Sequence, residues 1–259
     1  MKNLFLFLFL LVVFTSKAQD NRVSGLNSRQ FTKYWKVESE SPDYKVTFQG
    51  DTAEIVSPKG LTLWRKEKMS GKVTIEYDAC VVVESDGDRL SDLNCFWMAS
   101  DPQYPDNLWK REKWRSGIFL NCYSLQLYYL GYGGNHNSTT RFRRYDGDES
   151  GITNPKARPA ILKEYTDAGH LLKPNHWYHI KITNENNRVS YYIDGERLVD
   201  FRDAEPLREG WFGFRTTLSR TRITNFSYEC SSQEATAVPL QWIGETPRQD
   251  KVVSFGVPF

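Results

Sequence analysis

Cysteine is scarce in this sequence: the 259-residue chain has four, and they lie far apart. Cys80, Cys95, Cys122 and Cys230 form no CxxC pair, so their spacing argues against a compact zinc site. All four fall in runs with strand-like alternation, where a buried free thiol is common. An exported chain would also permit disulfides, and all three possible pairings remain open.

The sequence also lacks a large surplus of charge and a clear amphipathic helix. The formal net charge is only +2, so bulk charge gives no indication of a nucleic-acid partner. No stretch repeats apolar residues with the helical period, and no Ser-His-Asp or Cys-His signature is present. Helical bundles and hydrolases with such triads are therefore disfavoured.

Aromatic residues, by contrast, are abundant. They make up 14% of the chain, including 8 Trp and 14 Tyr, and the hydrophobic content of 39% is enough for a core. Two explanations stay open. The rings contact sugars, which offer flat apolar faces, or they fill the interior of a β-sandwich.

Residues 1–18 have the pattern of a secretory signal peptide. Lys2 is followed by an apolar run from Leu4 to Phe14 and by a small-x-small cleavage pattern that predicts cutting before Gln19. The run is too short to span a membrane, and no cysteine at the cleavage position offers a lipid anchor. We therefore expect a secreted or periplasmic protein without a membrane span.

Alternating apolar and polar residues predict β-strands along most of the remaining chain. The longest clean example is Lys72 to Val83, in which Val73 and Ile75 begin an apolar face and Thr74 and Glu76 a polar one. Turn signals recur at short intervals. The pattern predicts an all-β protein with an antiparallel β-sandwich or jelly-roll fold.

The segment Ser116 to Tyr145 is the predicted site. It is expected to form strand, turn, strand, loop and strand. The loop Gly131–Asn137 is rich in glycine and amide side chains, which let a ligand approach the backbone closely. The strand after it bears Arg141, Arg143 and Arg144. Because neighbours on a strand point to opposite faces, these three arginines cannot all bind one ligand.

Two further loops each have two possible roles. The insertion Ser100–Arg115 is expected either to wall the cleft beside the Gly131 loop or to cover an edge of the sheet. The acidic loop Glu84–Asp88 offers carboxylates for a structural calcium ion, but it also fits a solvated turn. No other metal or cofactor is predicted.

Two segments near the end of the sandwich carry a family resemblance. HWYHIKITNENNRVSYYIDGERLVDF and GWFGFRTTLSRTRITNFSYE look like the closing strands of concanavalin-like sandwich domains. With the segment 117–144, they resemble an uncharacterised sandwich family of bacterial pectin-degradation clusters. The resemblance covers roughly Phe31 to Glu229 and implies contact with a polysaccharide or oligosaccharide. It does not fix the chemistry, because this fold hosts lyases, hydrolases and binding modules.

The tail carries a second resemblance. VPLQWIG and VSFGVPF look like the opening strands of the amino-terminal barrel in rhamnogalacturonan exolyases, and the residues before them resemble a linker. This resemblance implies a possible exolyase domain in a longer homologue. We thus expect a signal peptide at 1–18, a β-sandwich domain at 19–230, and a linker with the start of a second domain at 231–259. Alternatively, the tail pairs with an edge of the sandwich.

The leading hypothesis is a polysaccharide lyase that cleaves a pectic uronate by β-elimination. The reaction needs a group that neutralises the uronate carboxylate, a base for the C5 proton and an acid for the leaving oxygen. Tyr132 and His136 are predicted to supply the base and the acid, in either order, with Arg141 or Arg143 holding the carboxylate. The Gln-x-His motif of concanavalin-like alginate lyases is absent, since no histidine lies two residues after Gln126.

Substrate contacts are predicted at seven further positions, and two other functions remain open. One is a noncatalytic glycan-binding domain, in which His136 only caps a turn. The other is a glycoside hydrolase that uses Glu76 and Asp78, which share a strand face. The predicted substrate contacts are Trp97, Trp109, Trp114, Tyr128, Asn135, Arg143 and Arg215.

Overall fold

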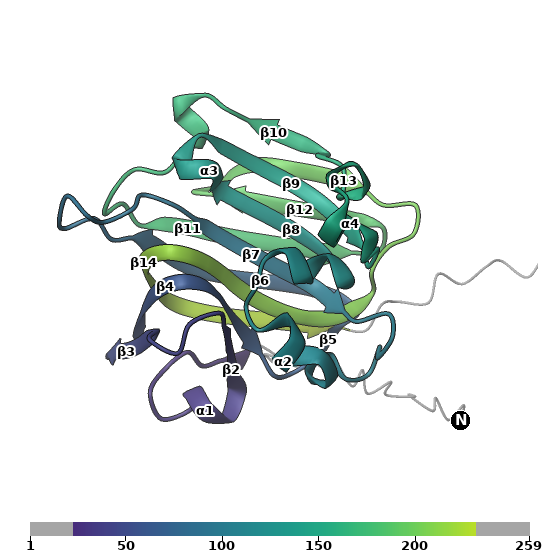
Figure 1. Cartoon of the computed structure of the whole chain (residues 1–259), viewed down its shortest axis with the longest axis horizontal. Helices are drawn as coiled ribbons and strands as arrows, with labels where there is room; N and C mark the ends of the chain where they lie inside the picture. Colours follow the sequence, from purple (N-terminus) through teal and green to yellow (C-terminus); the bar gives the residue numbers. More distant parts are fainter. Residues whose placement is uncertain (1–22, 232–259) are drawn as a thin grey trace, which may run out of the picture.

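The computed structural model describes residues 23–231, and most of their regular structure is β-strand (Figure 1). The predicted signal peptide and, apart from Ser231, the predicted linker and second domain lie outside the described residues. The strands are β1 (Val23–Ser24), β2 (Trp35–Ser39), β3 (Lys45–Gln49), β4 (Thr52–Arg65), β5 (Met69–Ser70), β6 (Lys72–Val81), β7 (Leu93–Ser100), β8 (Gln126–Gly133), β9 (Thr139–Asp146), β10 (Lys163–Tyr165), β11 (Tyr178–Glu185), β12 (Arg188–Ile193), β13 (Glu196–Arg202) and β14 (Glu209–Ser231).

The helical segments are all a single turn or little more, in agreement with the lack of amphipathic helix patterns. Among residues 23–231, no helix is long and apolar enough to cross a membrane. With η denoting a 3-10 helix, these segments are α1 (Phe31–Tyr34), η1 (Leu108–Arg111), α2 (Glu112–Arg115), η2 (Leu120–Ser124), α3 (Gly134–Asn137), α4 (Ser150–Thr153), η3 (Pro155–Ala157) and η4 (Ala168–His170).

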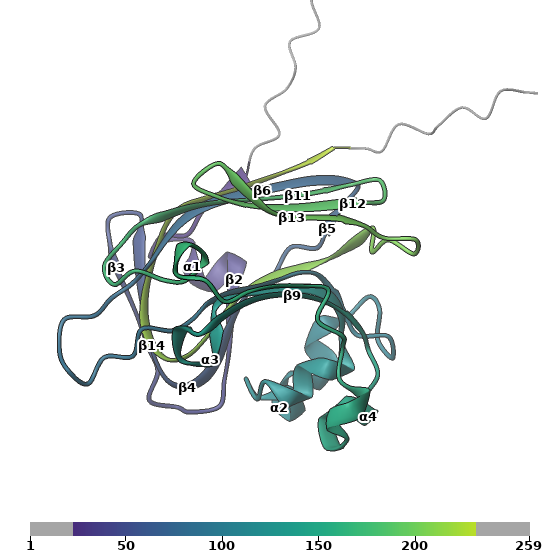
Figure 2. The same cartoon turned by 90° about the horizontal axis from the view of Figure 1, so that it is seen from above.

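The strands form two layers that face each other, which confirms the predicted antiparallel β-sandwich (Figure 2). The layer that we call the front sheet runs β10-β9-β8-β7-β14-β4-β2, and the back sheet runs β13-β12-β11-β6-β14-β4-β3. Strands β4 and β14 are long enough to belong to both sheets, so they join the layers along one side.

The crossing from one sheet to the other accounts for two features of β4. Pro58-Lys59-Gly60 has residues typical of a turn, but it lies within β4 where the strand passes between the sheets. Its partner β14 shifts register between Thr217 and Ser219 at the same level. Strands β2 and β3, which follow one another in the chain, both pair with β4.

Buried and half-buried residues alternate along β6, and the buried ones face the main core between the layers. Val73, Ile75 and Tyr77 are at most 3% exposed, whereas Thr74 and Glu76 are only half-buried. This is the division of faces that the sequence predicted. The front sheet contributes its own inward residues to the same cluster, among them Cys95, Trp97, Leu130 and Phe142.

A second apolar cluster lies on the outer face of the front sheet. Residues 100–125 fold into η1, α2 and η2 and cover part of this face; we call this segment the cap (Figures 1 and 2). Cap residues such as Leu108 and Cys122 pack there against Phe96, Leu127 and Tyr145. The insertion therefore covers a sheet face rather than a sheet edge.

The first strand predicted in the segment Ser116–Tyr145 is wrong. Ser116 and Gly117 have φ of 46° and 69°, and the Ile118 N–H donates to the Arg115 carbonyl at 2.8 Å. This left-handed pair ends α2 and turns the chain into η2, so Leu120–Ser124 is a 3-10 helix. The two later strands of the prediction are present as β8 and β9.

The four cysteines are free in the structure, so none of the possible disulfides is formed. Cys80, Cys95 and Cys230 lie in strands, as expected, whereas Cys122 lies in η2. Burial raises the pKa of Cys95 to about 12 and that of Cys122 to about 11. These two thiols therefore behave as small apolar core groups.

Candidate functional site

A polar row of side chains crosses the outer face of the front sheet beyond the end of the cap. Cross-strand partners point to the same face of a sheet, so consecutive pairings place these side chains next to one another. Neighbouring strands are roughly 4.8 Å apart, and the row therefore extends over several strand spacings. Its members, in order from β9 to β2, are Arg141, Gly131, Asn94, Arg215, Thr62 and Glu38.

A cleft of about 470 Å³ lies over the middle of this polar row. Its floor comes from β7, β8, β9 and β14, and the cap supplies a wall of Phe119, Leu120 and Tyr123. The segment before β7 and the loop after β9 close other sides. The residues that line the cleft are Glu40, Arg89, Asp92, Asn94, Phe119, Leu120, Tyr123, Tyr129, Gly131, Gly134, Asn135, His136, Thr139, Arg141, Arg143, Arg158, Arg215 and Thr217.

The cleft is strongly cationic. Five arginines line it, whereas Glu40 and Asp92 are its only lining carboxylates among the described residues. The whole chain is almost neutral, so this charge is concentrated locally. Apolar walls beside the arginines reduce screening by water. The arrangement favours an anionic ligand.

The five arginines are not equally free to bind a ligand. Arg141 Nε donates to Glu164 at 2.5 Å, and Arg143 donates to the Pro159 carbonyl. Arg158 Nε donates to the Gly151 carbonyl at 3.3 Å. These bonds fix the arginines of β9 and of the following loop at the rim, and the charge of Arg141 is partly neutralised.

Arg215 and Arg89 lie at the inner side of the cleft. Arg215 is only 4% exposed, and its Nη1 donates to the Gly117 carbonyl at 2.5 Å. Arg89 Nη1 donates to the Thr217 carbonyl at 2.8 Å, while its buried Nε has no partner within residues 23–231. Each guanidinium therefore has a fixed orientation and donors left over. The charges of both arginines act on the Asp92 carboxylate, and the donors left over can bind a further anion.

Tyr129 places its hydroxyl on the floor beside Gly131. A Cβ atom on Gly131 would lie 2.3 Å from this hydroxyl, so only glycine leaves room for it. Burial raises the pKa of Tyr129, and the Asp92 charge adds to the increase, although Arg215 and Arg143 oppose it. The phenol is therefore protonated at neutral pH and is a hydrogen-bond donor.

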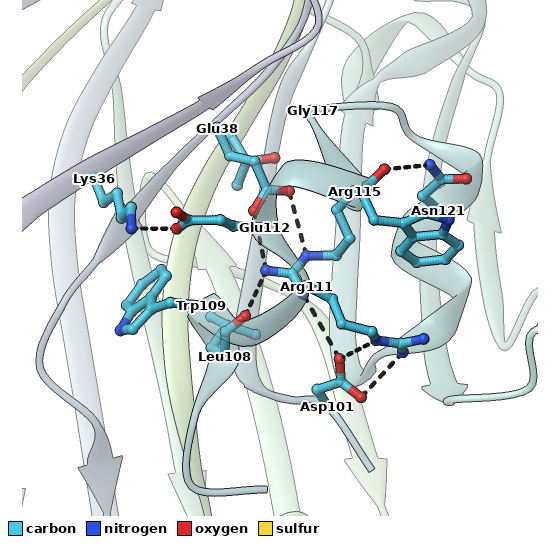
Figure 3. A network of polar contacts seen from close by, with 12 residues as sticks. Lys36, Glu38, Asp101, Leu108, Trp109, Arg111, Glu112, Arg115, Gly117 and Asn121 are labelled. Atoms are coloured by element: carbon cyan, nitrogen blue, oxygen red, sulfur yellow. Dashed lines mark hydrogen bonds and ion pairs between the residues drawn. The ribbon is translucent and has the colours of Figure 1, made fainter. Parts of the chain in front are cut away.

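Buried ion pairs hold the cap in place, as Figure 3 shows. Arg115 donates to Glu38 at 3.0 and 3.3 Å and to the Leu108 carbonyl at 2.6 Å. Arg111 donates to Asp101 at 2.7 and 3.0 Å. Burial raises the pKa of Glu38, while the Arg115 charge opposes the rise. These contacts attach α2 to β2 and η1 to Asp101, the residue after β7, and they thereby fix the wall of the cleft.

The structure brings five of the predicted site residues together in this cleft. His136 and Asn135 are exposed at the rim, on the tip between β8 and β9, where three consecutive residues have left-handed φ. The others come from β9 and β14. The five residues are Asn135, His136, Arg141, Arg143 and Arg215.

Three other predicted residues point into the core instead. Tyr128 pairs with Arg144 across the strands, whereas Tyr129 pairs with Arg143. The even-numbered residues of β8 therefore face the back sheet, and the predicted catalytic Tyr132 is 3% exposed and packs against Tyr178. Tyr128 donates to Asp203 at 2.6 Å. Trp97 is fully buried among Tyr128, Phe142 and Tyr191.

The two tryptophans predicted from the insertion lie on the cap but do not line the cleft. Trp109 packs against Trp211 with ring centroids 6.1 Å apart. Trp114 is 43% exposed and stacks against the Arg111 guanidinium. The part of the cap that lines the cleft is Phe119–Tyr123 instead.

Sequence reasoning missed several residues of the cleft. Arg89, Asp92 and Asn94 surround the start of β7, and Tyr129 lies one position from the predicted Tyr128. Arg141 and Arg143 pair with Gly131 and Tyr129, so the odd-numbered residues of β8 lie on the same face as these arginines. The arginines therefore indicate Tyr129 as a cleft residue once the register between β8 and β9 is known. The residue pattern alone does not determine that register.

The carboxylate pair considered for a hydrolase lies on the back sheet, and each member contacts a basic side chain. Glu76 is 3.1 Å from Lys181 Nζ, and Asp78 is 2.7 Å from His179 Nδ1. These contacts weaken the hydrolase alternative. In the acidic loop, Asp88 accepts from the backbone N–H of Glu84 and Ser85. Residues 23–231 contain no group of three side chains suited to a metal ion.

Comparison with known proteins gives the family and the fold. The sequence profile of the family described as "Domain of unknown function (DUF6250)" matches residues 55–226. The chain belongs to this family. The matched segment of the DUF6250 protein includes the floor, the cap and the rim of the cleft. A search of curated proteins gave no match.

Solved structures similar to this DUF6250 protein share the sandwich fold. A protein of unknown function with a galectin-like fold from Bacillus subtilis has a TM-score of 0.62 and 16% identity, over 81% of this chain and 94% of that chain. The carbohydrate-binding module CBM66 from Bacillus subtilis has a TM-score of 0.51 and 16% identity, over 75% and 94%. The exoplasmic/lumenal domain of VIP36, with calcium and mannose bound, has a TM-score of 0.55 and 10% identity, over 92% and 99%.

Proposed function

We propose that this protein binds an acidic glycan in the arginine-lined cleft and cleaves it by β-elimination. The observation that carries the proposal is the concentration of five arginines in one cleft of a nearly neutral chain. Solved structures with the same fold include a carbohydrate-binding module and a domain with bound mannose, which supports a sugar ligand. Arginine favours the carboxylate of a uronate because its planar fork binds both oxygens.

The role that we assign to each cleft residue in the reaction follows from its position in the cleft. Arg215 and Arg143, on opposite sides of Tyr129, neutralise the uronate carboxylate and so make the C5 proton more acidic. His136 at the rim takes that proton. The protonated Tyr129 donates to the leaving glycosidic oxygen, and a double bond forms between C4 and C5 as that bond breaks. Tyr129 thus replaces the core residue Tyr132 in the mechanism.

The proposed substrate is a pectic uronan, and the proposed location is outside the cytoplasm. The substrate follows from the resemblance to pectin-degradation proteins and from the cationic cleft. The location follows from the signal-peptide pattern of residues 1–18. The proposal also includes an exolyase domain in a longer homologue, which the resemblance of the tail implies.

Ultraviolet absorbance tests the lyase proposal directly. β-Elimination leaves an unsaturated uronate, which absorbs at about 235 nm, the general signature of this chemistry. Residues 19–259 are incubated with polygalacturonate and with rhamnogalacturonan. The expected result is an absorbance rise that His136→Ala abolishes. His176→Ala is the matched control, because His176 lies outside the cleft and is half-exposed.

A noncatalytic binding domain is the second candidate. The observation that favours it is the position of His136, which is exposed and makes no hydrogen bond or ion pair within the described residues. Under this alternative, polygalacturonate retards the protein in a gel but no absorbance rise occurs with any uronan. Binding without turnover would replace the lyase proposal with this one.

A further inference from the structure

Asn94 lines the cleft, and its side chain carries an unsatisfied acceptor. Asn94 is only 6% exposed, and its Oδ1 is buried without a hydrogen-bond partner among the described residues. It lies in the middle of the polar row, between Gly131 on one strand and Arg215 on the other. A buried polar atom without a partner is unfavourable, and a ligand group that satisfies it gains affinity.

Asp92 determines which end of the Asn94 amide faces the cleft. Asn94 Nδ2 donates to Asp92 Oδ2 at 2.6 Å, and the backbone N–H of Thr217 donates to Asp92 Oδ1 at 3.3 Å. Both oxygens of Asp92 accept hydrogen bonds, so the amide nitrogen must point toward them. The Asn94 carbonyl oxygen is therefore held away from Asp92, 3.2 Å from the position that a Cβ atom on Gly131 would take.

The groups around Asn94 restrict what can satisfy this oxygen. Arg215 Nη1 already donates hydrogen bonds to the Gly117 carbonyl and to Thr62 Oγ1. A Cβ atom added to Gly131 would lie 3.2 Å from Asn94 Oδ1, so little space separates the acceptor from the floor beside it. Among the groups of a sugar, a hydroxyl is a compact donor that can satisfy such an acceptor, whereas an ester has no hydrogen to donate.

We propose that Asn94 is a specificity-determining residue that requires a free hydroxyl on the acidic sugar bound by Arg215. The inference rests on the proposed function and makes it more specific. The arginines offer only donors and recognise the carboxylate, while Asn94 offers an acceptor and recognises an unsubstituted hydroxyl of the same unit. The preferred ligand is therefore a uronan without O-acetyl groups on that unit.

Binding of two matched ligands tests this inference. The ligands are a galacturonan oligosaccharide and the same oligosaccharide with O-acetylated ring hydroxyls, measured by calorimetry. The wild-type protein is expected to bind the free form at least about tenfold more tightly. Asn94→Ala is expected to reduce this preference to less than about threefold. Asn187→Ala, at an exposed turn of the back sheet, is expected to keep it.

The outcomes separate this inference from the proposed function. Equal wild-type affinity for the two oligosaccharides would overturn the role of Asn94 while acidic-glycan binding stands, and so would a full preference in Asn94→Ala. No binding of either ligand would overturn both. If Asn94→Ala does not fold, Asn94→Ser replaces it, because the serine hydroxyl is too short to reach the same position. The wild-type comparison needs no variant.

Discussion

Arg215 Nη1 donates a hydrogen bond to the Gly117 carbonyl oxygen at 2.5 Å. This bond joins the floor of the cleft on β14 to the turn that follows the cap helix α2. Gly117 is also enclosed by the backbone of β2 and β4, so the position of Arg215 depends on how tightly the cap packs onto these strands.

Gly117→Ala is predicted to destabilise the protein. Its φ of 69° disfavours residues with a Cβ, and the added atom would lie 2.7 Å from the Glu40 N and the Gly60 O. We expect a loss of about 1–3 kcal/mol in the free energy of unfolding from backbone strain, measured by urea denaturation. Gly87→Ala is the control, because no atom lies within 4 Å of its added Cβ. Equal stability of the two variants would contradict this account of the cap.

The pair Arg115 and Glu38 is predicted to be strongly coupled. Arg115→Met leaves the Glu38 carboxylate buried without its main partner, which costs about 3–5 kcal/mol of stability. Arg115→Met combined with Glu38→Met removes both charges and is expected to be more stable than Arg115→Met alone. A double-mutant cycle by urea denaturation measures the coupling. Additive effects would show that the two side chains do not depend on each other.

His170 is predicted to make stability depend on pH. Desolvation lowers its pKa, but hydrogen bonds to Asp167 at 2.8 Å and Glu196 at 3.3 Å outweigh this effect, so the pKa is raised. The stabilisation of the folded protein by His170 is complete below the pKa of this group in the unfolded state, and it is lost as pH rises through its pKa in the folded state. The free energy of unfolding of the wild type is compared with that of His170→Gln at about pH 6 and at about pH 8.5. The wild-type advantage should be smaller at the higher pH, and an unchanged or larger advantage there would contradict the assignment.

Tyr129→Phe is predicted to separate turnover from binding. The variant keeps the ring that packs between Phe96 and Phe119 but removes the proposed acid. We expect the rate of uronan cleavage to fall by about a hundredfold or more while affinity changes by only a fewfold. Tyr123→Phe is the control, since Tyr123 also lines the cleft but has no role in the proposed reaction. A Tyr129→Phe enzyme with wild-type turnover would exclude Tyr129 as the acid.

The sequence was sufficient to predict the sandwich, because most strands alternate clearly. The alternation of β6 predicted both of its faces correctly. Helix η2 was missed because Ile118, Leu120 and Cys122 alternate like a strand, whereas two left-handed residues before them turn the chain.

The face of β8 could not be predicted from its alternation. Leu127 and Tyr129 pack in one apolar cluster, while Tyr128 and Leu130 pack in the other. Because the cap covers part of the outer face, both faces of this strand are apolar and neither is marked as exposed. Arg141 and Arg143 of β9 line the cleft, whereas the predicted Tyr128 and Tyr132 of β8 lie in the core.

Calorimetry of polygalacturonate binding to Arg215→Ala tests the central claim most directly. Loss of a charge-assisted hydrogen bond corresponds to about 1.5–3 kcal/mol, so the affinity should fall by about tenfold or more at low ionic strength. Arg202→Ala, which removes an exposed arginine of the back sheet, should bind like the wild type. If Arg215→Ala retains wild-type affinity, or if both variants weaken binding equally, the acidic glycan is not bound in this cleft.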